Sequence, residues 1–223
     1  MAKKRKDDTL VDLVEVTGQV ENFWEKNQNN VLGVVALLAV LIGGYFAYFN
    51  LYQVPREKEA QESMYQAEFQ FEKDSFALAL TNPGGGFDGF LDIIENYSGT
   101  SSANISKYYA AVCYLHMGQF EEAADLIDGF SADGKVTPAM KYGIRGDIYA
   151  EQSDLSKASS QYKKAANSSD SDFLSSYYLK KYGESMEVQG NKSEALAAYE
   201  EIKSKYSTTA DARNIDMYIN RLK

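Results

Sequence analysis

The chain has 223 residues, 44% of them hydrophobic, and a formal net charge of −9. This length is enough for one ordinary domain with a full hydrophobic core. An acidic domain without a basic stripe is unsuited to nucleic acid, because binding to phosphates requires clustered Lys and Arg side chains. The single cysteine excludes an intrachain disulfide.

Residues 1–30 are predicted to form a cytoplasmic tail. Apolar residues recur at helical spacing from Leu10 to Val20, through Leu13, Val14 and Thr17. This pattern is typical of an amphipathic helix that lies on a membrane surface. A partly disordered tail is the alternative interpretation.

Residues 31–52 are predicted to form a single transmembrane helix. No charged residue occurs from Val31 to Phe49, and at about 1.5 Å per residue this run is roughly as long as the ~30 Å hydrocarbon core of a bilayer. The run ends in aromatic residues, which suit the membrane interface. A cleaved signal sequence is typically shorter, and a buried core helix rarely lacks any polar break, so an uncleaved anchor is favoured over both.

A stripe of small residues follows one face of this predicted helix. Ala39, Gly43 and Ala47 are spaced four residues apart, and small side chains at this spacing let a second membrane helix approach closely. We therefore expect a contact with a partner helix here. The alternative is that the stripe only reflects how common Ala and Gly are in membrane helices.

The predicted orientation places the tail inside the cell. Basic residues are more numerous before the apolar run than after it, where Arg56 and Lys58 are the nearest. The positive-inside rule then assigns the tail to the cytoplasm and residues 53–223 to the opposite side, which is the periplasm in a Gram-negative cell. The reversed orientation is the alternative.

Three segments of the large domain align without gaps: 118–127, 153–162 and 190–199. Each segment begins with Gly or Ser and has an alanine five residues later. Before each segment the chain has a small residue, followed three residues later by an aromatic residue or Met. The alanines are Ala123, Ala158 and Ala195, the small residues are Ala111, Gly146 and Gly183, and the large residues are Tyr114, Tyr149 and Met186. Such a period indicates helix–turn–helix units in which small residues allow close crossing of two helices. The pattern resembles the tetratricopeptide repeat, without its usual first-helix Trp.

A degenerate unit is predicted before these repeats. Its first helix is expected from Arg56 to about Leu80, the break at Asn82–Gly86, and its second helix from Phe87 to Tyr97. The last segment, Ala210–Lys223, is predicted to be a closing helix with one apolar side, as a solenoid needs at its open end. The predicted fold is therefore all-α: one N-terminal transmembrane helix, then a tetratricopeptide-like α-solenoid of about four helical hairpins with a C-terminal capping helix at 53–223.

No catalytic constellation is present in the sequence. His116 is the only histidine, and a structural or surface role is expected for it. Cys113 precedes it by one helical turn, so a Cys–His nucleophile is the one catalytic alternative, but a packed core thiol is favoured. Gly84–Gly86 lacks the Lys and Ser or Thr of a phosphate loop. We predict a non-enzymatic protein with no cofactor, metal or small-molecule substrate.

The remaining expectation is protein binding. Solenoids of this kind usually present the first helix of each hairpin to a concave groove. In this register the predicted groove residues are Tyr108, Val112, Leu115, Asp147, Ala150, Lys180, Glu184 and Glu187.

The arrangement of tail, apolar run and repeats resembles the YfgM-like ancillary subunits of the bacterial Sec translocon. The resemblance is densest from Glu25 to Tyr52 and in the segments Gly118–Ala124 and Gly190–Ala198. It implies a non-enzymatic scaffold in the inner membrane, with translocon subunits, periplasmic chaperones or emerging chains as partners. The alternative is an assembly scaffold for another cell-envelope complex, with the same topology and different partners.

Overall fold

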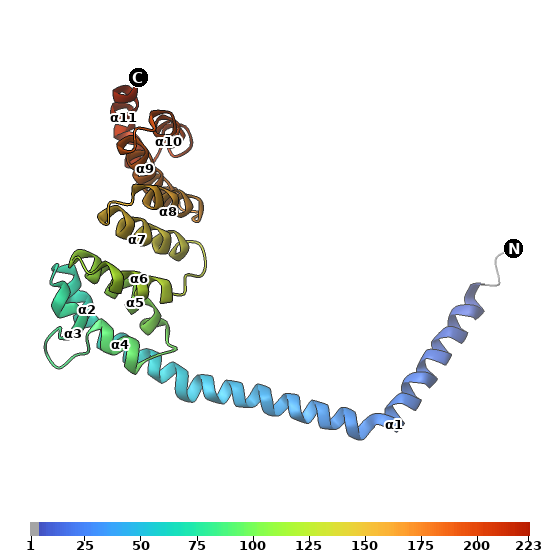
Figure 1. Cartoon of the computed structure of the whole chain (residues 1–223). Helices are drawn as coiled ribbons and strands as arrows, with labels where there is room; N and C mark the ends of the chain where they lie inside the picture. Colours follow the sequence, from blue (N-terminus) through green and yellow to red (C-terminus); the bar gives the residue numbers. More distant parts are fainter. Residues whose placement is uncertain (1–4) are drawn as a thin grey trace. The chain divides into compact units, whose positions relative to one another are not determined.

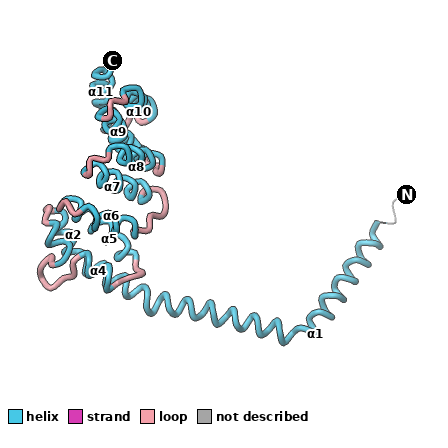
Figure 2. The backbone as a smooth tube through the Cα atoms, viewed as in Figure 1, coloured by secondary structure: helices cyan, strands magenta, loops and turns pink. Residues whose placement is uncertain are grey.

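The computed structural model describes the backbone of residues 5–223 and the side chains of residues 24–223. Within these residues the chain is helical, with turns and loops between helices and no strand (Figures 1 and 2). It divides into two compact units, one ending at Pro55 and the other comprising Arg56–Lys223. The all-α prediction is confirmed.

The first unit contains one long helix. It consists of α1 (Arg5–Tyr48) followed by a π-helical turn, η1 (Phe49–Gln53). The helical stretch Trp24–Glu72 contains a window that is long and apolar enough to cross a membrane, and none of that window is buried. The backbone of α1 continues through residue 30, where the predicted tail ends. The side chains of the predicted amphipathic stripe, from Leu10 to Val20, lie outside the described residues.

The second unit contains three antiparallel helical hairpins at the predicted places (Figure 1). They are α5 (Ser101–His116) with α6 (Phe120–Gly129), α7 (Thr137–Glu151) with α8 (Leu155–Asn167), and α9 (Asp172–Val188) with α10 (Lys192–Lys205). A short 3₁₀ helix, η2 (Asp211–Asn214), leads into α11 (Ile215–Leu222). Ile215 and Ile219 are buried against the third hairpin, so α11 closes the end of the hydrophobic core as predicted.

The degenerate repeat before these hairpins differs from the prediction. It consists of α2 (Val54–Glu72), α3 (Phe76–Thr81) and α4 (Phe90–Asn96). The expected continuous helix to Leu80 is wrong, because the chain turns at Asp74, whose φ is 57°, and the amide of Ser75 donates to the carbonyl of Gln70. The turn lets α3 bury Ala79 and Leu80 in the core that α2 shares.

The second helix of this unit also begins later than predicted. Phe87 lies in the loop before α4 and is 45% exposed, whereas Phe90 starts the helix and is fully buried. Gly89 comes directly before α4, and a Cβ at this position would lie only 2.3 Å from the carbonyl oxygen of Leu80. Only glycine fits against the backbone of α3 at this position.

Helix α2 is joined to its neighbours by two charged side chains near its start. The guanidinium of Arg56 donates to the carbonyl of Asn96 at 2.7 Å, at the C-terminal end of α4. The carboxylate of Glu57 accepts from the amides of Ser101 and Ser102 at 2.6 and 3.1 Å. Both charges have the sign that the adjacent helix terminus favours.

The small residues that define the repeat make space for large side chains of the paired helix. A Cβ on Gly146 would lie 2.5 Å from the Tyr162 ring, and a Cβ on Gly183 would lie 2.5 Å from the Tyr199 ring. In the first hairpin the equivalent positions hold Ala111 and the smaller Ile127, both fully buried. Small and large residues therefore vary together between the hairpins.

We predict that Gly183→Ala lowers the free energy of unfolding by about 1–3 kcal/mol, because the added methyl group overpacks the α9–α10 crossing. Adding Tyr199→Ile should recover part of this loss, because it reproduces the Ala–Ile pair of the first hairpin. Urea denaturation of the purified protein in detergent, followed by circular dichroism, measures both. A double variant that is no more stable than Gly183→Ala would contradict this packing explanation.

Candidate functional site

A hollow of about 420 Å³ lies among the first helices of the three hairpins. It is formed by α5, α7 and α9 together with one residue of α8. Its lining residues are Val112, Leu115, His116, Ile144, Asp147, Ala150, Glu151, Tyr162 and Lys181. The lining is mixed: Val112, Leu115, Ile144 and Ala150 are aliphatic, whereas the other five residues carry polar or charged groups.

The structure brings together half of the predicted groove residues. Val112, Leu115, Asp147 and Ala150 line the hollow. The other four predicted residues do not line it. Tyr108 packs against Phe130, with ring centroids 5.8 Å apart.

The predicted residues of the third hairpin lie beside the capping elements instead. Lys180 pairs with Asp211 of η2 at 3.5 Å, and Glu187 pairs with Arg221 of α11 at 2.7 Å. Glu184 is half-buried on the same helix. These side chains form a second polar stretch, separate from the hollow.

Asp147 is the polar centre of the hollow. Its Oδ1 accepts a hydrogen bond from the Tyr162 hydroxyl at 2.7 Å and another from the Lys181 ammonium at 2.7 Å. These two donors come from α8 and α9, so one carboxylate links the interior of the second hairpin to the first helix of the third. Such charge-assisted hydrogen bonds are the stronger ones in proteins.

This carboxylate and its surroundings shift the pKa values of its two partners. Burial raises the pKa of Tyr162, and the charge of Asp147 and its hydrogen bond raise it further. Burial alone would lower the pKa of Lys181, but Asp147 and Tyr177 outweigh that effect, so the pKa is raised. Lys181 therefore stays charged and Tyr162 stays neutral at physiological pH.

Sequence reasoning missed Lys181, although it named the residue before it. One residue along a helix turns the side chain by about 100°, so Lys180 and Lys181 point to different neighbours. In the repeat alignment Lys181 is equivalent to Ile144, which also lines the hollow. That equivalence was the available signal, but it suggested an apolar position rather than a charged one.

An aromatic surface continues from the hollow along α9. The Lys181 ammonium lies 5.2 Å from the centroid of the Tyr177 ring, and the Tyr177 ring stacks on that of Phe173 with centroids 6.4 Å apart. Phe173 is 60% exposed and Tyr177 is 38% exposed. Exposed aromatic rings beside a hollow are typical of surfaces that contact partners.

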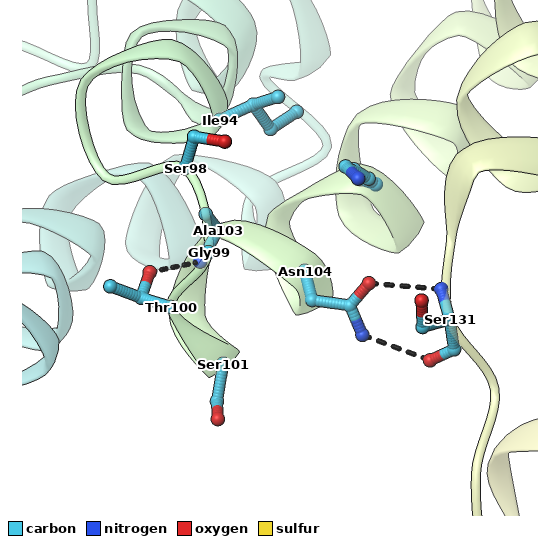
Figure 3. A pocket seen from close by; sticks show the side chains of 9 residues that line it. Ile94, Ser98, Gly99, Thr100, Ser101, Ala103, Asn104 and Ser131 are labelled. Carbon is cyan, nitrogen blue, oxygen red and sulfur yellow. Dashed lines mark hydrogen bonds between the residues drawn. The ribbon is translucent and has the colours of Figure 1, made fainter. Parts of the chain in front are cut away.

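A second hollow, of about 340 Å³, lies where the α4–α5 loop meets the α6–α7 loop (Figure 3). Asn104 bridges the backbone of Ser131 there: its Oδ1 accepts from the Ser131 amide and its Nδ2 donates to the Ser131 carbonyl, both at 2.9 Å. The Lys107 ammonium donates to the carbonyl of Gly129. These polar groups hold the loop after α6 in place by hydrogen bonds, so we assign this hollow a structural role rather than a binding role.

The cysteine and histidine of α5 are not arranged as a nucleophile and base. Cys113 is fully buried, and burial raises the pKa of its thiol to about 12, so the reactive thiolate is not formed near neutral pH. The His116 ring stacks on Phe76, with centroids 4.5 Å apart. Among the described residues no group of three or more His, Cys, Asp or Glu side chains could hold a metal ion.

The small-residue stripe Ala39, Gly43 and Ala47 lies in α1. These residues are exposed, and a Cβ on Gly43 would have no atom within 4 Å. A contact with a partner helix stays a prediction.

The tetratricopeptide repeat family profile matches residues 181–209. The match comprises the second half of α9, the turn, all of α10 and the chain just beyond it. No curated protein and no solved structure matches the chain. The family match and the helical hairpins together identify a protein that contains a tetratricopeptide repeat, a unit that mediates protein–protein interaction.

We predict that the free energy of unfolding falls as pH rises from about 10 to 12. Burial first, and then the charge of Asp147, raise the pKa of Tyr108 to about 12, whereas an unfolded tyrosine ionises near 10. Above pH 10 the unfolded chain therefore binds fewer protons than the folded one, and stability is lost by at most about 1.4 kcal/mol per pH unit for each such group.

Urea denaturation at several alkaline pH values measures this slope. Tyr108→Phe should make the decline shallower, and Tyr65→Phe, at a residue that is 65% exposed, should leave it unchanged. An equal slope for both variants would contradict the assignment of the effect to Tyr108.

Proposed function

We propose that this protein is a non-enzymatic, membrane-anchored scaffold or chaperone-linked subunit of the Sec translocon. It binds proteins in the periplasm through the inner surface of its helical hairpins. The observation that carries the proposal is the hollow around Asp147, whose walls come from successive first helices. A surface assembled from several repeats suits an extended protein segment better than a compact metabolite.

The aliphatic part of the lining supports the choice of partner. Leu115 and Ala150 are half-buried and offer apolar surface beside the exposed rings of Phe173 and Tyr177. Chains that emerge from a translocon expose apolar side chains before they fold, and transient burial of those side chains lowers their tendency to aggregate. Periplasmic chaperones are the other partners that the resemblance suggests.

The apolar helix supports the proposed location. The chain has a helical window of suitable length and composition to span the inner membrane. The basic residues of the tail favour an N-terminus in the cytoplasm. The stripe Ala39, Gly43 and Ala47 is then the proposed contact with membrane helices of the translocon.

Site-specific photocrosslinking in cells tests this function. A photoreactive residue at Gly43 should trap a translocon subunit, whereas one at Leu41, a membrane-helix residue two positions earlier that points to a different face, should not. A photoreactive residue at Leu115 should trap secreted chains or periplasmic chaperones, and one at the exposed Lys192 is the matched control.

Recovery of only an unrelated envelope complex from Gly43 would contradict the translocon assignment and favour an assembly scaffold. Equal yields from Leu115 and Lys192 would contradict a role for the hollow.

A further inference from the structure

The hollow carries one negative charge that has no ion-pair partner among the residues whose side chains the structure describes. Asp147 is paired with Lys181 at 2.7 Å, but Glu151, at the end of α7, takes part in none of the ion pairs among the described residues. The nearest cations of the neighbouring polar stretch, Lys180 and Arg221, are paired with Asp211 and Glu187. The uncompensated group at the edge of the hollow is therefore an exposed carboxylate.

One part of the hollow is suited to an aliphatic side chain. Leu115 and Ala150 contribute apolar lining to a volume of about 420 Å³, which is at the small end of the roughly 300–1,000 Å³ typical of ligand pockets. It can admit a few side chains of a segment but not a folded domain. Lys181 neutralises Asp147, so an acidic side chain of a partner would be repelled by the unpaired charge of Glu151.

The aromatic surface extends the site along α9. Phe173 lies at the start of this 17-residue helix, and at about 1.5 Å per residue the helix is roughly 25 Å long. An extended peptide, at about 3.3 Å per residue, covers this length with seven or eight residues. The exposed faces of Phe173 and Tyr177 can contact aliphatic or basic side chains along that path.

We propose that the hollow and the adjacent surface of α9 bind an extended protein segment that combines aliphatic with basic side chains. An aliphatic side chain enters the space between Leu115 and Ile144, and a basic side chain pairs with Glu151. The inference rests on the proposed function, in which this surface receives protein partners, and adds the chemical class of the segment that it selects.

Fluorescence anisotropy with labelled decapeptides tests the selection. The full chain, in nanodiscs of uncharged lipid, is titrated against peptides that alternate Leu with Lys, Leu with Glu, Leu with Ser, and Ser with Lys. The Leu–Lys peptide should bind at least about ten-fold more tightly than the Leu–Glu peptide, because like charges at the hollow repel each other. The Ser–Lys peptide should also bind weakly, because it lacks apolar side chains.

Matched variants locate the effect. Glu151→Gln should weaken the Leu–Lys peptide about three-fold and leave the Leu–Ser peptide unchanged, because one exposed ion pair is lost. Leu115→Ser should weaken both peptides about five-fold. Glu121→Gln, on the exposed start of α6, should change neither, and thermal unfolding should confirm that each variant is folded.

Equal affinity for the Leu–Lys and Leu–Glu peptides, or an equal effect of Glu151→Gln and Glu121→Gln, would overturn the inference. So would self-association of the chain that Leu115→Ser abolishes while peptide binding persists, because the occupant would then be a second copy. Crosslinking from Leu115 separates the failure of this inference from the failure of the proposed function. If Leu115 traps secreted chains or chaperones but the peptides bind without selectivity, only the preference for aliphatic and basic side chains is contradicted. If Leu115 traps no protein, the proposed function itself is contradicted.

Discussion

The tyrosine of the second helix that fills the space above a first-helix glycine is the contact on which this solenoid depends. The Tyr162 ring occupies the space that a Cβ of Gly146 would take. Its hydroxyl donates a hydrogen bond to Asp147, the residue after Gly146 in α7. That carboxylate in turn holds Lys181 of α9. One side chain thus determines how closely two helices cross and which polar group faces the hollow.

The third hairpin repeats this arrangement. Tyr199 fills the space of Gly183, its hydroxyl donates to Glu187 at 3.2 Å, and Glu187 pairs with Arg221 of α11. The first hairpin has Ile127 in place of tyrosine and therefore has no hydroxyl to extend the contact. The links through tyrosine hydroxyls accordingly join the second hairpin to the third and the third to the cap, and the aliphatic lining of the hollow comes from both α5 and α7.

The repeat, its turns and its cap could be predicted from the sequence because they depend on local requirements. The positions that end the first helices are Gly118, Ser153 and Gly190, with φ of 76°, 63° and 80°, and a regular spacing of small residues shows where helices cross. The break at Asp74 was missed because the apolar pattern of α2 continues into α3, and nothing local indicates that the chain folds back there.

The candidate site was only half predictable for a related reason. The positions of Val112 and Asp147 follow from the repeat, and so does that of Lys181, which is equivalent to Ile144, but the repeat predicts an apolar residue there. Lys180, one residue earlier on the helix, pairs with Asp211 of η2 instead. Contacts between hairpins, which the periodicity does not contain, decide the polar chemistry of the inner surface.

Hairpin packing and the polar centre of the hollow form one connected unit through Asp147. A double-mutant cycle of Tyr162→Phe and Lys181→Met, read as the free energy of unfolding, tests it most directly. The two changes should be non-additive by about 0.5 kcal/mol or more, because both donors share the same carboxylate oxygen. Additivity to within about 0.3 kcal/mol would contradict it and would show that the packing and the hollow are independent.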